Sequence, residues 1–354
     1  MNDNHYIAIM AGGIGSRFWP SSKAERPKQF LDILGTGQSL IRQTYERVLP
    51  LCPPERILVV TNGRYKSLVQ EHLPEIPEEN ILMEPSRNNT APSVAYTALH
   101  LQARNPRAVF AMLPSDHVIL KDEAYRSLLG KAFEAAESDN KIVTLGISPT
   151  RPDTGYGYIE LGNEVEDQLY KVAQFKEKPD QDTAREYLDS GNYLWNAGMF
   201  IWSVPTILKA FEECSPEIKE VLERNKEAFG TDREQSYIDE VYPHTPSISV
   251  DYAILEKYSE VYSIPADIGW SDLGTWSSLH AYKDKDINAC VILGENTHLI
   301  DTKNTIVRSD AEKVVVVKGL DDYIIVDEPD ALLIYPKSDE QEVKEVVKRL
   351  KVEG

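Results

Sequence analysis

The sequence predicts an α/β protein: a Rossmann-like, mostly parallel sheet flanked by helices, followed by a smaller all-β unit. Short apolar runs alternate with helical periodicity in the first half of the chain, which is typical of strands joined by helices. Beyond about residue 285, short β-branched runs follow one another between Asn, Asp and Gly turns, which is typical of an all-β unit. The length of 354 residues also exceeds that of one ordinary domain. We therefore expect two domains, residues 1–285 and 286–354.

The first half is expected to supply strands and helices in alternation. Strands are predicted at residues 6–11, 57–61, 81–83, 108–113 and 142–146, and helices at 40–48, 64–73, 94–103 and 123–137. Ser39 stands where it can cap the first of these helices. Because strand–helix–strand connections cross over with a right hand, this alternation predicts parallel strands that are covered on both faces.

The second half is less regular. Strands are predicted at residues 154–161, 170–176, 194–202 and 261–264, and helices at 182–188, 206–213, 216–228, 250–257 and 273–282. Short strands at 290–293, 305–308, 314–317, 323–326 and 332–335 then form either a small sandwich or a few coils of a β-helix. Ser338 and Gln341 form a capping box that predicts a last helix. The apolar stripe of that helix consists of Val343, Val346, Val347 and Leu350.

The chain is strongly acidic. It carries 38 Lys and Arg against 57 Asp and Glu, for a formal charge of -19. Such a surface repels nucleic acids and anionic lipids, so neither a nucleic acid nor a membrane is expected as a partner. An anionic substrate therefore needs local basic residues or a divalent cation that reverse the field at its site.

The composition and the N-terminus favour a cytoplasmic protein. The three cysteines, Cys52, Cys214 and Cys290, are odd in number and form no CxxC pair, which is typical of a reducing compartment. The first residues, Met-Asn-Asp-Asn-His, lack the basic region and the cleavage site of a secretory signal. No apolar run approaches the ~18 residues that a membrane-spanning helix needs.

The first predicted strand runs into a glycine loop, Gly12-Gly13-Ile14-Gly15. Glycines let a backbone approach a ligand closely and reach positive φ, and consecutive amides can then bind phosphate. A dinucleotide fingerprint needs another glycine where Phe18 stands, and a P-loop needs a Gly-Lys-Ser/Thr that the sequence lacks. A phosphate loop of another kind and a tight turn without a ligand both stay open.

Two cations favour the phosphate site. Arg17 follows the glycine loop, and Lys28 follows Pro27 in a segment that is short of regular structure. Single lysines and arginines are more often solvated surface charges. Two cations at this spacing, however, can hold a triphosphate from two sides.

The glycine loop and its cations resemble the signature of a known family. Gly12-Gly13-x-Gly15-x-Arg17 with Pro27-Lys28 is similar to the signature of the sugar-1-phosphate nucleotidyltransferases. The longer form, Arg17-Phe18-Trp19-Pro20 with Pro27-Lys28-Gln29-Phe30-Leu31, resembles the guanylyltransferases among them. Four later segments match in order, so the resemblance covers essentially the whole chain. It implies a nucleotidyltransferase fold to about residue 285 and a β-helix-like C-terminal unit.

The resemblance implies which residues contact the nucleotide. They are Ala11, Gly12, Gly13, Gly15, Ser16, Arg17, Lys28, Glu84, Asn89, Thr90, Ala91, Ser115 and Asp116. The residues that it implies for catalysis are Arg17, Lys28, Asp116 and Asp272.

Two aspartates are candidates for a metal site. Asp116 follows a predicted strand, at the sheet edge where ligands bind, and Asp272 stands on a turn before a predicted helix. Two carboxylates and phosphate oxygens form the oxygen set that Mg²⁺ prefers, and the resemblance implies Mg²⁺ at both aspartates. From the residues alone, turn or helix-cap aspartates are the commoner interpretation. Zinc is not expected, because the seven histidines form no HExxH motif and none pairs with a cysteine.

Glu84 begins a polar segment that enters a predicted helix. From the residues alone this segment is a loop, with Thr90 as the N-cap of the helix. In the guanylyltransferases, the matching segment lies at the nucleobase of the bound nucleotide. Guanine presents two donors on one edge, the ring N1–H and the exocyclic amine, and Glu84 can accept both. A uracil or thymine edge offers only one donor there.

Three segments, residues 155–159, 175–179 and 195–200, are similar to the sugar-phosphate segments of the family. By resemblance, Glu177 and Asn196 bond sugar hydroxyls, Gly157 packs against the sugar ring, and Lys178 holds the sugar phosphate. Residues 249–252 also resemble a family segment, which adds Asp251 to the sugar residues. A carboxylate and an amide that accept or reject particular hydroxyls are how a site distinguishes epimers.

The resemblance implies that GTP and α-D-mannose 1-phosphate react to GDP-mannose and diphosphate with Mg²⁺ as cofactor. A homodimer built on the C-terminal strands is expected, with a monomer as the alternative. Two other functions stay open: a related enzyme that uses UTP or dTTP with glucose 1-phosphate, and a non-catalytic nucleotide-sensing relative. Many family members continue into a cupin-type isomerase domain that this sequence lacks, so no mannose-6-phosphate isomerase activity is expected.

Overall fold

The computed structural model describes residues 2–137, 140–309 and 312–350, which form two compact units. Unit 1 consists of residues 1–12, 45–115 and 119–270, and unit 2 of residues 13–44, 116–118 and 271–354. The domain boundary at residue 285 stays a prediction, because these units follow packing and each gathers several segments of the chain.

Unit 1 is built on a nine-stranded sheet in the order β3-β2-β1-β4-β8-β5-β9-β7-β6. Its strands are β1 (His5–Met10), β2 (Ile57–Asn62), β3 (Ile81–Glu84), β4 (Val109–Pro114), β5 (Ile142–Ile147), β6 (Tyr158–Glu166), β7 (Leu169–Lys176), β8 (Tyr193–Ser203) and β9 (Val261–Pro265). The first four strands are parallel to one another, as predicted, and so are β5 and β9. Strand β8 pairs antiparallel with β4, β5 and β6. Strands β6 and β7 are also antiparallel, because a short turn joins them and only antiparallel strands permit such a turn. The α/β class is confirmed, with a sheet that is parallel in its first half and mixed in its second.

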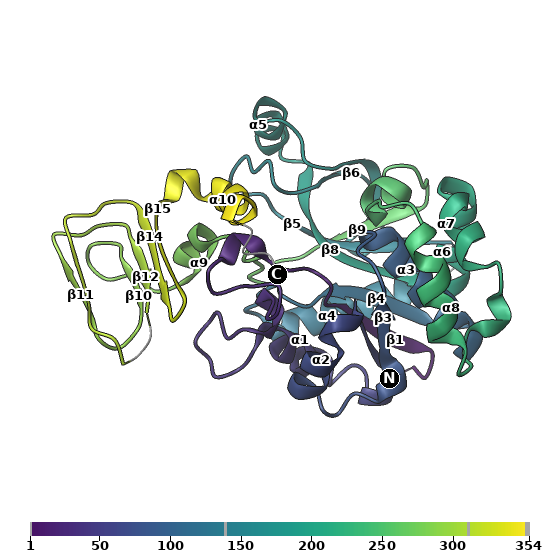
Figure 1. Cartoon of the computed structure of the whole chain (residues 1–354). Helices are drawn as coiled ribbons and strands as arrows, with labels where there is room; N and C mark the ends of the chain where they lie inside the picture. Colours follow the sequence, from purple (N-terminus) through teal and green to yellow (C-terminus); the bar gives the residue numbers. More distant parts are fainter. Residues whose placement is uncertain (1, 138–139, 310–311, 351–354) are drawn as a thin grey trace. The chain divides into compact units, whose positions relative to one another are not determined.

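Helices cover both faces of this sheet (Figure 1). The helices of unit 1 are α2 (Lys66–His72), α3 (Thr90–Arg104), α4 (Asp122–Glu137), α5 (Gln181–Ser190), α6 (Val204–Cys214), α7 (Pro216–Leu222) and α8 (Glu234–Val241), and α1 (Leu40–Val48) begins in unit 2 and ends in unit 1. One core joins the inner sides of α3, α6, α7 and α8 to alternate residues of β1, β2 and β4. Helices α2 and α4 contact strands β2 to β5 and β8. Because the central strands are buried on both faces, their polar ends alone are left for ligands.

Unit 2 contains short β-helical coils, drawn in yellow-green in Figure 1. Its strands are β10 (Val291–Leu293), β11 (Thr297–Ile300), β12 (Ile306–Arg308), β13 (Val315–Lys318), β14 (Tyr323–Glu328) and β15 (Ala331–Pro336). Strands β10, β12 and β14 stack in parallel, as do β11 and β13, and antiparallel β15 ends the stack. Of the two predicted alternatives, the β-helix is therefore the observed one.

Residues 13–44 pack with the C-terminal segment in unit 2. Phe18 and Trp276 are fully buried, with ring centroids 4.8 Å apart, and the Trp276 indole donates to the Trp19 carbonyl at 3.3 Å. Trp276 begins helix α9 (Trp276–Tyr282), and helix α10 (Val343–Leu350) adds Val343 and Val347 to the same core. Phe18 stands where a dinucleotide fingerprint needs a glycine, and its buried side chain holds the end of the glycine loop in this core.

Several sequence-based details are corrected. The predicted capping box is wrong: the Ser338 hydroxyl donates to Asp339, and a 3₁₀ turn (Lys337–Glu342) precedes α10. The predicted helix 216–228 ends at Leu222, and residues 250–257 contain only a short π-helical turn. Strand β11 and helix α8 were not predicted. None of the helices among the described residues combines the length and apolarity that crossing a bilayer requires.

Candidate active site

Four predicted nucleotide residues meet at the carboxyl ends of the parallel strands of unit 1. Ala11 follows β1, and its amide donates to Val60 at 2.8 Å. Ser115 follows β4, and its amide donates to Met10 at 3.1 Å. Gly12 then passes next to the end of β3, since a Cβ at this position would lie 3.2 Å from Oε2 of Glu84. This edge is where open α/β sheets bind ligands.

Glu84 is a buried carboxylate held by two hydroxyl groups. The side chain is 8% exposed, and its Oε1 accepts hydrogen bonds from Ser93 and Tyr242. Burial raises the pKa of Glu84 above its ordinary value, while the two hydroxyl donors favour the ionised form. With Oε1 occupied, Oε2 is the oxygen left for the predicted contact with a base.

The segment after Glu84 enters helix α3 differently from the prediction. Asn89, at a φ of 67°, is the N-cap, and its side-chain oxygen accepts from the Thr90 amide at 2.9 Å. The predicted cap, Thr90, is instead the first helical residue, and its hydroxyl accepts from the Val250 amide at 2.9 Å. The Ala91 amide donates to Ile248 at 3.1 Å. These bonds attach the predicted base segment to the chain that leads to Asp251.

The rest of the glycine loop belongs to unit 2. The carbonyl of Gly13 accepts from the side-chain amide of Gln29 at 2.9 Å, and the carbonyl of Ile14 accepts from the Ser22 hydroxyl at 2.5 Å. Gly15 has a φ of 71° and caps the short 3₁₀ turn Ser16–Phe18. Because the loop carbonyls are bonded within unit 2, its amides are the groups that fit a phosphate. Arg17 is exposed beside this loop.

Lys28 joins the two predicted metal aspartates within unit 2. Its side chain is only 3% exposed, and its ammonium donates to Oδ2 of Asp116 at 3.0 Å and to the backbone carbonyl of Asp272 at 2.8 Å. A Cβ at Gly15 would lie 2.5 Å from Cβ of Lys28, so the left-handed glycine is what lets Lys28 sit here. Burial raises the pKa of Asp116, but the charges of Lys28 and His117 outweigh it, and the pKa lies below its ordinary value.

The donor set at these aspartates fits a hard cation. The Asp116 carboxylate is 32% exposed, and Asp272 holds its own turn by accepting from the Gly274 amide at 3.0 Å. Two carboxylates with phosphate oxygens form the ligand set that Mg²⁺ takes. Within the part of the chain that the structure describes, no three His, Cys, Asp or Glu side chains gather to hold a metal by themselves.

The predicted sugar residues lie together in unit 1. Glu177 is 8% exposed at its side chain and accepts from the ammonium of Lys178, which is itself 56% exposed. A Cβ at Gly157 would clash with Oε2 of Glu177, so a larger residue here would displace this carboxylate. The Gly157 carbonyl accepts from the Asn196 amide at 2.8 Å.

Asp251 completes this cluster. Its Oδ1 accepts from the side-chain amide of Asn196 at 2.9 Å, and Oδ1 of Asn196 accepts from the Gly198 amide at 3.0 Å. These bonds fix which end of the Asn196 amide donates. Burial, and then the nearby charge of Glu177, raise the pKa of Asp251 to about 6.

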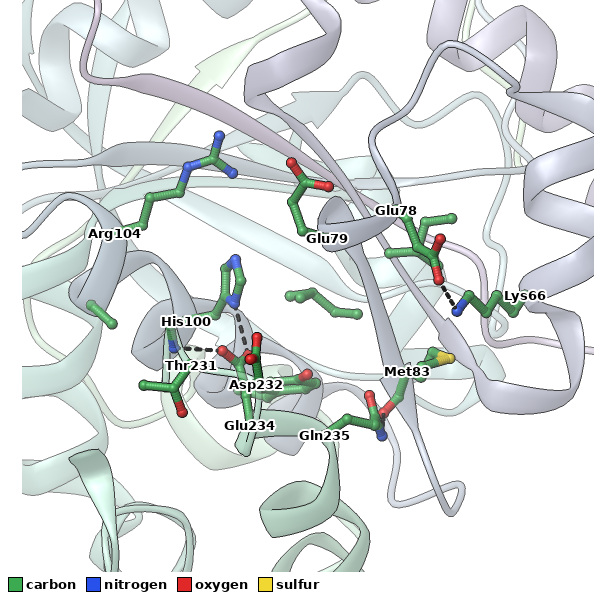
Figure 2. Close-up of a pocket in the computed structure, with 15 residues that line it drawn as sticks. Lys66, Glu78, Glu79, Met83, His100, Arg104, Thr231, Asp232, Glu234 and Gln235 are labelled. Atoms are coloured by element: carbon green, nitrogen blue, oxygen red, sulfur yellow. Dashed lines mark hydrogen bonds and ion pairs between the residues drawn. The ribbon is translucent and has the colours of Figure 1, made fainter. Parts of the chain in front are cut away.

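A cavity of about 860 Å³ beside edge strand β3 contains none of the predicted site residues (Figure 2). Its polar walls are largely paired among themselves. His100 donates or accepts through Nδ1 with Glu234 at 2.7 Å, the Gly230 amide donates to Glu234 at 2.7 Å, and Lys66 pairs with Glu78 at 2.6 Å. The residues predicted for the site thus lie outside this cavity.

Comparisons with known proteins match the chain in two parts. A family model described as nucleotidyl transferase matches residues 7–289. A second model, described as MannoseP isomerase/GMP-like beta-helix domain, matches residues 295–350.

Relatives match over nearly the whole chain. It is 37% identical to a mannose-1-phosphate guanylyltransferase of Salmonella muenchen, over 97% of this chain and 72% of that protein. It is 36% identical to a mannose-1-phosphate guanylyltransferase of Escherichia coli (strain K12), over 99% of this chain and 74% of that protein. A crystal structure from Thermus thermophilus, described as a mannose-1-phosphate geranyltransferase, is similar with a TM-score of 0.89 and 36% identity, over 98% of this chain and 99% of that one.

Proposed function

Because the chain belongs to the nucleotidyl transferase family, we propose that it transfers a guanylyl group from GTP to mannose 1-phosphate, giving GDP-mannose and diphosphate. One structural observation carries the choice of nucleotide. Glu84 is a buried carboxylate at the carboxyl end of β3 with Oε2 directed at Gly12, so it suits the donor edge of guanine.

The reaction is an in-line displacement at phosphorus. An anionic phosphate oxygen of the sugar phosphate forms a bond to the α-phosphorus, and the bond to the diphosphate leaving group breaks on the opposite side. No proton needs to be removed from the nucleophile and no covalent enzyme intermediate is needed. Catalysis then consists of positioning and charge neutralisation.

Arg17, Lys28 and the amides of the glycine loop bind the phosphates of GTP in this proposal. The buried ammonium of Lys28 is oriented by its two oxygen acceptors and loses little freedom when a phosphate arrives. Asp116 and Asp272 would hold Mg²⁺, which neutralises phosphate charge when bound. Their oxygens fit that ion, whereas the net charge of -19 by itself repels both substrates.

The sugar phosphate binds at the cluster of unit 1. Glu177 and the Asn196–Asp251 pair accept and donate to hydroxyl groups, and the exposed ammonium of Lys178 binds the phosphate. Two hydrogen bonds fix the orientation of the Asn196 side-chain amide. A sugar in which one hydroxyl is inverted therefore leaves one buried polar group of this cluster without a partner.

We also propose a homodimer that acts in the cytoplasm. Unit 2 exposes large apolar side chains on and beside its last strands, Val314, Val316, Leu332 and Ile334, which suit a contact with a second copy. The three cysteines are free thiols, which suits a reducing compartment.

Glu84→Gln tests the proposed nucleotide directly. The amide offers one acceptor and one donor where the carboxylate offers acceptors only, so we expect kcat/KM for GTP to fall about tenfold or more while UTP and dTTP change little. Diphosphate release with each nucleotide measures this. An equal loss with all nucleotides contradicts the role of Glu84.

A further inference from the structure

We propose that Tyr242 is a specificity-determining positioning residue, which fixes Glu84 so that its Oε2 alone meets the edge of the base. The sequence pattern did not indicate Tyr242, and its role rests on the proposed function. It acts through Glu84 and contacts no reacting atom.

The hydrogen bonds at Oε1 favour Tyr242 as the principal partner. The hydroxyl of Ser93 has a second acceptor, the Asn89 carbonyl at 3.2 Å, so its single proton is shared between two sites. The Tyr242 hydroxyl is directed at Glu84 and lies 3.4 Å from the Ser93 oxygen. A carboxylate held at one oxygen by a rigid aromatic side chain cannot rotate freely about its last bond.

The position of Oε2 explains how this affects the base. A Cβ at Gly12 would lie 3.2 Å from Oε2, so this oxygen is directed at the first glycine of the loop. Held there, it accepts from both donors of the guanine edge. If Glu84 rotates, the ring N1–H keeps a partner more easily than the exocyclic amine, and the preference for guanine over hypoxanthine falls.

Tyr242 is itself held in place by hydrogen bonds at both ends of the segment that carries it. Helix α8 begins at the cavity of Figure 2, where the side-chain amide of Gln235 donates to the carbonyl of Met83 at 3.1 Å, directly before Glu84. At the other end, the side-chain amide of Asn88 donates to the carbonyls of Tyr242 at 3.0 Å and of Thr245 at 2.9 Å. Both attachments lead back to the segment around Glu84, so the tyrosine and the carboxylate are positioned by the same elements.

The pKa of Glu84 gives a second measurable consequence of the role of Tyr242. The titratable group that acts on the pKa of Glu84 is Tyr242, and the charge of Glu84 in turn raises the pKa of both Tyr242 and Tyr96. Glu234 and Asp239 also raise the pKa of Tyr96. Burial raises the pKa of Glu84 and the Tyr242 hydroxyl lowers it. Removing that hydroxyl therefore raises the pKa further. Since only the ionised carboxylate accepts both donors, GTP use is then lost at a higher pH as the solution is acidified.

Tyr242→Phe tests this proposal in the full chain, with Tyr237→Phe as the matched control. Tyr237 lies on helix α8, which ends directly before Tyr242, and is buried, but its hydroxyl donates to the Leu222 carbonyl at 2.8 Å. Steady-state diphosphate release is measured with GTP and with inosine triphosphate, which lacks the exocyclic amine. We expect Tyr242→Phe to lower the GTP-to-inosine triphosphate ratio of kcat/KM about tenfold and to move the acid limb for GTP to higher pH. Tyr237→Phe should change neither.

A double variant separates positioning from general damage. If Tyr242 acts through Glu84, adding Tyr242→Phe to Glu84→Gln should not change the ratio again. An unchanged ratio in Tyr242→Phe, or a further fall in the double variant, overturns the inference. Ser93→Ala gives a second measurement in case Tyr242→Phe does not fold. Because Tyr242 still holds Oε1 in this variant, the ratio should change little, and a tenfold fall, which would make Ser93 the principal partner, is the contradicting result. Failure of the unmodified chain to release diphosphate from GTP and mannose 1-phosphate contradicts the proposed function instead.

Discussion

Lys28→Ala is the change that should separate catalysis from folding most sharply. The Lys28 ammonium lies 3.0 Å from Oδ2 of Asp116, and at an effective dielectric constant of 20 their attraction is about 5 kcal/mol before desolvation. Burying the ammonium offsets much of this, and water reaches the partly exposed Asp116, so we expect a loss of about 1–3 kcal/mol in the free energy of unfolding. Turnover should fall by about 10²–10³, as when one oriented charge-stabilising donor is removed from an active site.

The assay pairs diphosphate release with urea unfolding. Asp116 has a lowered pKa, so the stability it contributes is present above its unfolded pKa and is lost as the pH falls through the folded value. The stability difference between Lys28→Ala and the unmodified chain should therefore shrink in acid. Lys23→Ala is the control, because Lys23 pairs with the exposed Asp330 in the same unit. A folded Lys28→Ala protein with turnover within a few-fold of the unmodified chain would refute the role of Lys28.

Two further predictions concern the sugar residues. Gly157→Ala places a methyl group 2.4 Å from Oε2 of Glu177, so KM for mannose 1-phosphate should rise about tenfold with KM for GTP unchanged. Gly130→Ala, whose new methyl meets nothing within 4 Å beyond its chain neighbours and the backbone of its own helix, is its control, and an unchanged sugar KM in Gly157→Ala speaks against the cluster. Asp251 has a pKa raised from 3.8 to about 6, so the folded chain binds its proton more tightly and stability from this group falls as pH rises through that window. Asp251→Asn should remove this fall in urea unfolding series across that range, and an unaltered slope would show that Asp251 does not titrate as described.

The strands of the central sheet were predictable because they are continuous apolar runs. Residues 57–62 are buried without exception, which a hydrophobic pattern reveals directly. Strand β11 was missed because Thr297–Ile300 alternates half-buried and exposed residues within a short span. Helix α8 was missed because Glu234–Val241 is rich in Glu, Asp and Gln and buries few apolar residues. The antiparallel position of β8 between β4 and β5 depends on contacts between distant segments, and local periodicity does not predict such contacts.

The candidate site also divides into residues that a local motif predicts and residues that only the fold brings together. The glycine loop, Lys28 and Asp116 form a local motif with a physical reason for each residue, and the structure joins Lys28 to both aspartates within one unit. Tyr242 lies 158 residues from Glu84 in the sequence and belongs to no motif, so its hydrogen bond to that carboxylate emerges only from the fold. The N-cap at Asn89 was assigned to Thr90 because both residue types cap helices, and the left-handed backbone at Asn89 distinguishes them.

Diphosphate release from GTP, UTP and dTTP, each with mannose 1-phosphate and glucose 1-phosphate, is the sharpest test of the proposed function. The buried carboxylate beside Gly12 and the fixed Asn196–Asp251 pair predict the highest kcat/KM for GTP with mannose 1-phosphate. A chain that uses UTP or dTTP with glucose 1-phosphate equally well, or that releases no diphosphate from any pair, would contradict it.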